Sequence, residues 1–219
     1  MEWPSMKKFS EFNNRKDVYK LSPDYDDHII MTRDITLFDG ASPFKINPPP
    51  ANDSDETRIE LSEIADRMEL ASSEERHKAQ EYDIRYSDEF IGYCVHHNLP
   101  INEKKIMRMV HEMSAIDRKV KYNFNRPRPE QMANILGIRF PNAFAITADT
   151  PSYPSGHSAG SRTLALYLSN LFPSHKQEFL NMAEECGMSR ITLGVHFPSD
   201  HEAGVSLGEQ FYERLKDKT

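Results

Sequence analysis

Cysteine is scarce in this sequence, with Cys94 and Cys186 the only two among 219 residues. Two cysteines are too few for a disulfide framework, and they lack the spacing of a metal site, so we expect two buried thiols. Long apolar runs are also missing, because the best one, residues 164–172, is interrupted by Ser169 and Asn170. This run is too short for a transmembrane helix, and we therefore expect no insertion into a membrane.

The N-terminus and the charge exclude further classes of protein. Residues 1–8 are followed by mixed polar residues rather than by an apolar stretch with a cleavage site, so we recognise no secretory signal. On this ground we expect a cytoplasmic protein, or a periplasmic one if a signal has been removed. The formal net charge of −7 argues against general nucleic-acid binding, which makes a local cluster of basic residues more informative.

Strand-like alternation is nearly absent as well, and the sequence has no repeats or low-complexity tracts. Apolar residues instead recur at helical spacing through most of the chain after the proline run at 48–50. We predict one all-α domain, a single-domain helical bundle, for which this length supplies a sizeable core. Residues 1–44 lack clear periodicity and are interpreted as an N-terminal arm or irregular lead-in, which leaves residues 45–219 as the helical domain.

Cap residues and prolines predict where the helices begin and end. Pro127 and Pro129 should end one helix, because proline cannot continue it. Residues 130–153 have the composition of a long connection, and a buried helix should then run to Leu171. The expected helix starts are, in chain order, Asp53, Ser72, Ser87, Asn102, Ser174 and Ser199.

The sequence is organised around the turn at residues 152–160, Ser-Tyr-Pro-Ser-Gly-His-Ser-Ala-Gly, which opens that buried helix. The first N–H groups of a helix have no intrahelical partner, and with the helix dipole behind them they favour an anion. Gly156 lets the backbone approach a ligand closely, and His157 can hold or give a proton near neutral pH. Taken by itself, the turn is explained equally well as an ordinary helix cap. The segments on either side of it therefore have to distinguish an anion site from a cap.

Two further segments carry residues suited to an anion. Residues 121–129 hold a basic cluster at the end of a helix, where solvated charges complementing the helix dipole are the alternative explanation. In residues 189–200, Arg190 lies among apolar residues, where an unpaired charge would be costly. His196 and Asp200 are spaced so that the carboxylate can fix the imidazole tautomer, although a capped helix with a satisfied histidine would look similar.

Together, the three segments resemble the signature of the superfamily that joins type 2 phosphatidic acid phosphatases, bacterial class A non-specific acid phosphatases and vanadium haloperoxidases. The flanking residues, Ser152-Tyr153 and 185–188, are most similar to the class A acid phosphatases. The resemblance covers residues 45–212 and implies the helical fold of that superfamily. The matching positions are Lys121, Arg128-Pro129, Pro154-Ser155-Gly156-His157, Ser189-Arg190, His196 and Asp200.

The first motif fits the sequence in two registers. Lys119 with Arg126-Pro127 satisfies it as well as Lys121 with Arg128-Pro129 does. We prefer the second pair, because an additional arginine two residues before the motif arginine is common in this superfamily.

The resemblance implies a metal-independent phosphomonoester hydrolase that acts on soluble phosphate esters without a cofactor. His196 would be the nucleophile that forms a phosphohistidine, oriented by Asp200, and His157 would protonate the leaving oxygen and then activate water. The implied phosphate-binding residues are Lys121, Arg128, Ser155, Gly156 and Arg190.

Three alternatives stay open at this point. A vanadium haloperoxidase would use the same pocket with vanadate as its cofactor, and a non-catalytic phosphate-binding protein would use it without chemistry. A metal site from His196, Asp200 and His201 is a weaker hypothesis, because the motif already employs two of these residues. The identity of the small-molecule phosphate ester and homo-oligomerisation are not decided by the sequence.

Overall fold

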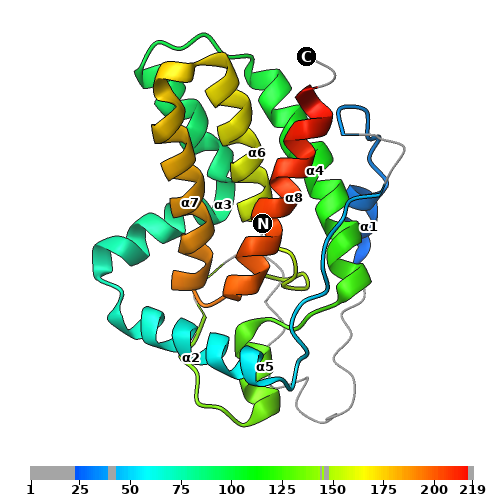
Figure 1. Cartoon of the computed structure of the whole chain (residues 1–219), viewed down its shortest axis with the longest axis vertical. Coiled ribbons are helices and arrows are strands. Elements are labelled where there is room, and N and C mark those ends of the chain that lie inside the picture. The colour runs from blue at the N-terminus through cyan, green and yellow to red at the C-terminus, as the bar shows by residue number, and fades with distance from the viewer. Residues whose placement is uncertain (1–22, 39–42, 144, 146–147, 217–219) are drawn as a thin grey trace, which may run out of the picture.

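The structure is a computed structural model that describes residues 23–38, 43–143, 145 and 148–216. It is all-α, as predicted, and the described ranges contain no β-strand. The elements, shown in Figure 1, are α1 (Tyr25–Met31), α2 (Asp55–Leu70), α3 (Ser73–His96), α4 (Glu103–Phe124), α5 (Pro129–Leu136), α6 (Gly156–Leu171), the 3₁₀ turn η2 (Pro173–His175), α7 (Lys176–Thr192) and α8 (Pro198–Lys216).

Helix α6 lies at the centre of a bundle formed with α3, α4, α7 and α8, while α2 and α5 lie at its lower end in Figure 1. The contact between α6 and α8 is unusually close, because glycines of α8 face the α6 backbone. A Cβ on Gly204 would lie 2.4 Å from the carbonyl oxygen of Ser155, and one on Gly208 would lie 2.4 Å from that of Ala159. The two helices can therefore bring their N-terminal ends together.

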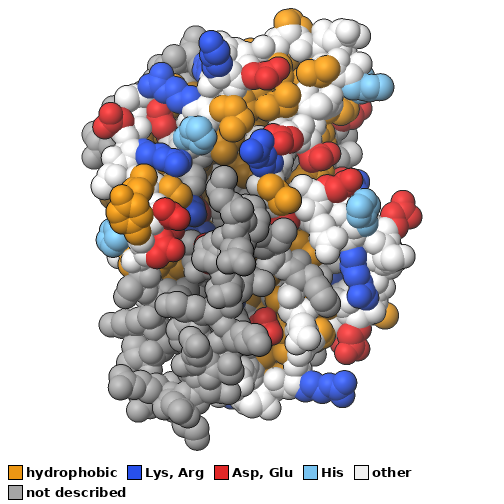
Figure 2. Space-filling model, turned by 180° about the vertical axis from the view of Figure 1, so that it is seen from behind, with side chains coloured by type: hydrophobic (Ala, Val, Ile, Leu, Met, Phe, Trp, Pro, Cys, Tyr) orange, Lys and Arg blue, Asp and Glu red, His pale blue; other side chains and the backbone are white. Residues whose placement is uncertain are grey.

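The largest core cluster fills the space between α3, α4, α6, α7 and α8. Both cysteines are buried free thiols, as expected. Outside the core, the described part of the face in Figure 2 carries charged side chains of both signs, interspersed with hydrophobic ones. The large apolar side chains of the cluster that are fully buried are Phe38, Phe90, Ile106, Met109, Leu164, Leu168, Phe179, Leu207 and Phe211.

Some predicted helix starts are confirmed. Ser72 caps α3 in a reciprocal capping box with Glu75, and Asn102 caps α4 by accepting from the N–H of Lys105. The start expected at Ser87 lies two residues after a kink at Arg85, whose backbone angles are φ −150° and ψ 78°. This kink divides α3 into two helical segments, so the expected break is present although α3 is assigned as one element.

Three caps are wrong. The cap of α2 is Ser54 rather than Asp53, and Ser174 lies inside η2 instead of capping α7. Ser199 lies inside α8, which begins at Pro198; proline suits a first helical position because its missing N–H would have no partner there. The N–H of Ser199 donates instead to Glu60 Oε1 at 2.6 Å, a tertiary contact that a local pattern cannot reveal.

Two connections contain helices that the sequence analysis did not predict. Helix α5 begins at Pro129 and occupies the first part of residues 130–153, which were expected to be a long connection, and α1 lies within the lead-in. Residues 1–22 lie outside the described residues, so the expected arm is described only in part. Its final residues pack on the domain: Phe38 is fully buried, and Glu112 accepts from the N–H groups of Thr36 and Leu37.

Candidate active site

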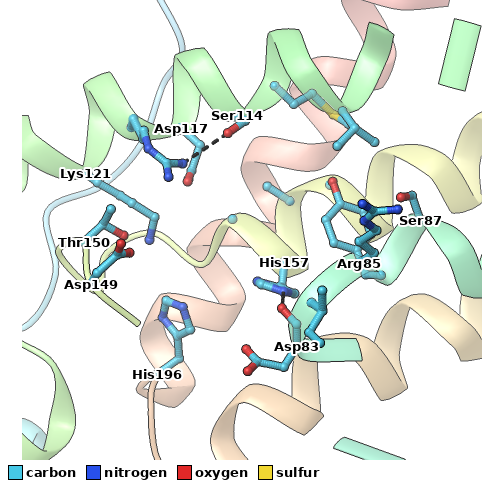
Figure 3. Close-up of a pocket in the computed structure, with 18 of the residues that line it drawn as sticks. Asp83, Arg85, Ser87, Ser114, Asp117, Lys121, Asp149, Thr150, His157 and His196 are labelled. Atoms are coloured by element: carbon cyan, nitrogen blue, oxygen red, sulfur yellow. Dashed lines mark hydrogen bonds between the residues drawn. The ribbon is translucent and has the colours of Figure 1, made fainter. Parts of the chain in front are cut away.

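A cavity of about 470 Å³ lies where the N-terminus of α6 meets α3, α4 and the residues that precede α5 and α8. Figure 3 shows its polar side chains converging from these elements. Of the residues predicted for the site, five line the cavity and three lie behind its wall. The lining ones are Lys121, Arg128, Gly156, His157 and His196; Ser155, Arg190 and Asp200 are not among the lining residues.

His196 and Asp200 form a buried hydrogen-bonded pair at the site. His196 Nδ1 lies 3.1 Å from Asp200 Oδ2, which also accepts from the N–H of Phe197 at 2.9 Å. A carboxylate accepts only, so Nδ1 carries the proton and Nε2 keeps its lone pair. Burial and the cation of Arg128 hold the pKa of His196 well below the ordinary value, which favours the neutral ring.

A buried arginine supports this pair from behind. Arg126 donates to Asp200 Oδ1 at 2.7 Å and to Glu60 Oε2 at 3.0 Å, and its guanidinium lies over the ring of Phe197. Glu60 was not singled out by the sequence analysis, because it occupies one position of an ordinary charged helix. These contacts keep the Asp200 carboxylate in place and leave Oδ2 for the histidine.

The geometry separates the two registers of the first motif. Lys121 and Arg128 line the cavity, whereas Lys119 is exposed and Arg126 lies in the ion pairs behind it. The pair preferred from the sequence is therefore the pair that reaches the cavity.

Arg128 contacts His196 on the Nε2 side of the ring, opposite Asp200. Its Nη1 lies 2.9 Å from His196 Nε2 and 2.8 Å from the carbonyl oxygen of Val195, and its Nε donates to the carbonyl of Thr150 at 2.8 Å. Burial and the neighbouring cation of Arg190 lower the pKa of Arg128 to about 10, so it stays charged at neutral pH.

Lys121 makes contacts that the motif alone does not suggest. Its Nζ donates to the carbonyl oxygens of Pro151, Ser152 and Pro154 at 3.0, 3.2 and 2.6 Å. An ammonium group has three donors, and all are engaged in shaping the turn before α6. Burial lowers the pKa of Lys121 to about 8, and the nearby carboxylate of Asp117 opposes that shift.

The second histidine faces His196 across the cavity (Figure 3). His157 Nε2 lies 3.1 Å from the carbonyl oxygen of Asp83, which can only accept, so Nε2 carries a proton. Burial and the cation of Arg190 hold the pKa of His157 well below its ordinary value. The ring also packs edge-on against Tyr86.

Arg190 lies behind the cavity wall in an ion pair with Asp83, at 2.7 Å between Nη1 and Oδ1. Both side chains are buried, and their ion pair offsets part of the cost of placing the charge of Arg190 among apolar residues. Asp83 therefore holds Arg190 through its side chain and His157 through its backbone. The sequence analysis missed Asp83, since an acidic residue in a charged helix carries no signal of its own.

Ser155 caps α6 rather than lining the cavity. Its hydroxyl oxygen accepts from the N–H of Ser158, and its own N–H donates to the carbonyl oxygen of Asp200 at 2.9 Å. Ser158 contacts both Ser155 Oγ and His201 Nδ1 at 2.9 Å, which places His201 in a hydrogen-bond chain behind the turn. Gly156 does line the cavity, with the carboxyl group of Asp117 against it.

The described residues contain no group of histidine, cysteine and acidic side chains arranged to hold a metal ion. His201 faces Ser158 rather than joining His196, so the weaker metal hypothesis has no geometric support. Among the helices of the same described ranges, none combines the length and apolarity needed to cross a membrane.

Comparison with known proteins relates part of the chain to a family. The sequence model of the PAP2 superfamily matches residues 109–211, the stretch that contains all of the motif residues. Residues 109–211 of this chain are therefore similar to the PAP2 superfamily. Helices α2 and α3, including Glu60 and Asp83, precede the matched PAP2 stretch.

Proteins with similar sequences include phosphatases. The chain is 38% identical over 96 residues to a non-specific acid phosphatase of Salmonella typhi, covering 44% of this chain and 38% of that protein. It is 33% identical over 92 residues to a lipid A 1-phosphatase of Rhizobium etli, covering 42% and 39%. The matches thus span less than half of these relatives.

The fold extends further than the sequence likeness. A bacterial vanadium-dependent iodoperoxidase has a similar structure, with a TM-score of 0.64 over 80% of this chain and 52% of that one. At 22% identity this likeness concerns the fold alone. The PAP2 helical fold, predicted from the motifs, is therefore confirmed.

Proposed function

We propose that this protein is a metal-independent phosphomonoester hydrolase that works through a phosphohistidine on His196. The observation that carries the proposal is the arrangement around that ring, with Asp200 on Nδ1 and Arg128 on Nε2. A neutral imidazole with its lone pair directed toward a cationic cavity is suited to attack an electrophilic phosphorus.

Positioning and charge supply most of what phosphoryl transfer needs. Lys121 and Arg128 contribute positive charge from the cavity wall, and Arg190 adds to it from behind. The N–H groups at the start of α6, including that of Gly156, are donors for a phosphoryl oxygen. These groups support binding of a phosphate ester without a metal ion.

In the first step, Nε2 of His196 forms a bond to phosphorus while the bond from phosphorus to the leaving oxygen breaks. The leaving oxygen takes a proton from His157, which must therefore be protonated when the substrate is bound. In the second step, His157 takes a proton from water, the water oxygen bonds to phosphorus, and the N–P bond to His196 breaks. Arg128 has to turn from Nε2 to the phosphoryl oxygens as the first bond forms.

Asp200 keeps the ring in the reactive tautomer and stabilises the charge that develops on it. Because Arg126 and the N–H of Phe197 also bind this carboxylate, it cannot rotate away without losing both contacts. The lining of the cavity also includes Ile84, Met107 and Val110, which suits an organic leaving group of a soluble monoester. The names of the relatives support the phosphatase class, and no single substrate follows from them.

A panel of phosphate esters, assayed for phosphate release in the presence of EDTA, tests the proposal. We expect turnover that EDTA does not reduce, competitive inhibition by vanadate, and acid-labile label on His196 after an alkaline quench with labelled substrate. Label that persists in His196→Ala would show that another residue is the nucleophile. Peroxide-dependent bromination with vanadate, without phosphate release, would favour the haloperoxidase alternative.

A further inference from the structure

One carboxyl group in the cavity has no role in the mechanism above. Asp117 lies on α4 one turn before Lys121, and only 7% of it is exposed. Its Oδ1 is buried and finds no hydrogen-bond partner within the described part of the chain. Every other buried carboxylate of the described residues has a cation or donor: Asp27, Glu60, Asp83, Glu112 and Asp200.

Asp117 points to the place where a phosphoryl group would bind. An added Cβ on Gly156 would lie 2.6 Å from Asp117 Oδ2, so the carboxyl group packs against the first residue of α6. Figure 3 shows Asp117 on the same side of the cavity as Lys121, across from His157. The unpartnered oxygen is thus beside the helix N-terminus that is to bind the anion.

An ionised Asp117 would conflict with that anion. Two like charges at hydrogen-bonding distance repel strongly in a buried site, whereas a neutral carboxylic acid can donate its O–H. Burial raises the pKa of Asp117, and the nearby cations reduce this effect only in part. The charged and titratable groups around it are Lys121 and Arg118 on α4, Arg128 before α5, Asp149 in the following loop, His157 on α6, His196 before α8, and Asp83, Arg85 and Tyr86 on α3.

We infer that Asp117 is a specificity-determining residue that meets the phosphoryl group as a neutral carboxylic acid and donates its O–H to a phosphoryl oxygen. This inference rests on the phosphoryl site of the proposed function. Binding of a dianion by the ionised protein then takes up one proton from solvent, which stays on Asp117 in the complex. The residue admits tetrahedral dianions in acid and expels them as it ionises.

Sulfate is the appropriate probe, because its charge stays constant across the neutral range while that of phosphate changes. Its affinity for the full chain is measured by calorimetry from about pH 5.5 to about pH 8.5, in buffers of different ionisation enthalpy that report the protons taken up. We expect the wild-type affinity to fall with rising pH by up to about tenfold per unit, and about one proton to be bound with the anion.

Asp117→Asn keeps the shape and supplies a neutral donor at every pH. Its sulfate affinity should fall less steeply with pH by about one proton and should exceed that of the wild type by about tenfold or more near pH 8.5. Asp149→Asn, which removes the same charge from an exposed lining position, should keep the wild-type pH dependence. Asp117→Ser provides a second neutral variant if the asparagine variant does not fold.

Identical pH slopes in the wild type and Asp117→Asn would overturn the inference, as would a wild type that takes up no proton. A uniform gain in affinity at every pH would also overturn it, because Asp117 would then stay ionised in the complex. The proposed function is judged separately by phosphate release. Turnover without proton uptake would leave it standing, and uptake without turnover would refute it while the inference held.

Discussion

The same helices form two different halves of the bundle, one with an apolar interior and one with polar and charged residues around the cavity. On α4, the buried positions Met109 and Met113 are followed at the same spacing by Asp117 and Lys121. On α6 the order is reversed, with buried serines at the N-terminal end and Leu164 and Leu168 toward the other end. The apolar half stabilises the fold, and the polar half holds charges whose burial is costly.

This contrast explains how the site keeps its geometry. Buried charges are tolerated when each is paired, as Arg126 is with Asp200 and Glu60. The apolar half supplies the free energy that offsets the cost of desolvating such groups. Substitutions in one half should therefore change activity, and those in the other should change stability.

The largest effect is expected from His196→Ala, which removes the proposed nucleophile. Phosphatase activity, measured as kcat/KM, should fall on the order of 10⁴-fold or more, with little change in the melting temperature. His111→Ala, on the exposed face of α4, is the matched control and should be close to wild type. Substantial residual activity in His196→Ala would contradict the assignment of activity to the polar half.

The next effect is expected from Phe179→Ala in the apolar half. Phe179 is fully buried and stacks on Phe90, with ring centroids 6.4 Å apart. The free energy of unfolding should fall by about 3–5 kcal/mol, because the substitution leaves a cavity. Denaturant unfolding measures this loss, and kcat/KM of the folded fraction should stay near wild type. Leu171→Ala, at an exposed position, should cost less than about 0.5 kcal/mol.

A smaller and more selective effect is expected from His157→Ala. A general acid matters when the leaving oxygen is very basic, and it matters little for a nitrophenolate, which is stable as an anion. The variant should lose about 10²-fold or more on an alkyl phosphate and much less on p-nitrophenyl phosphate, provided that chemistry limits both rates. Equal losses on the two esters would remove His157 from the role of proton donor.

The smallest effect concerns the pH dependence of stability. His157 and His196 have pKa values below their ordinary value of 6.5 in the folded protein. Below that pH the unfolded chain binds more protons, so each histidine lowers the free energy of unfolding as the pH falls, by up to about 1.4 kcal/mol per pH unit. The raised pKa of Asp117 acts in the opposite direction, because the folded state keeps that proton longer.

Single variants separate these contributions. His157→Gln should make the decline of stability below about pH 6.5 shallower, because one group that binds protons only on unfolding is gone. Phe179→Ala should shift the whole curve downward without changing its slope. Urea unfolding at a series of pH values distinguishes the two, and an unchanged slope in His157→Gln would contradict the assignment.

Local sequence patterns were sufficient for much of this molecule. Helical spacing predicted the all-α bundle, and the capping box of Ser72 and Glu75 was visible in the sequence because both residues belong to one turn. Caps failed where a tertiary contact competed, as at Ser199, whose N–H binds Glu60 on α2. The spacing of His196 and Asp200 predicted their contact, which forms across the start of α8, with His196 just before the helix and Asp200 in its first turn.

The tertiary structure decided what local patterns leave open. Lys119 and Lys121 fit the motif equally well, but residues two apart on a helix differ by about 200° in direction. Only the packing of α4 decides that Lys121 faces the cavity and Lys119 the solvent. The order of residues along the chain thus determined the fold class, the helices and the motif chemistry. The pairing of Asp83 with Arg190 and the unpartnered oxygen of Asp117 depended on which helices meet, because burial and long-range contact are properties of the folded chain.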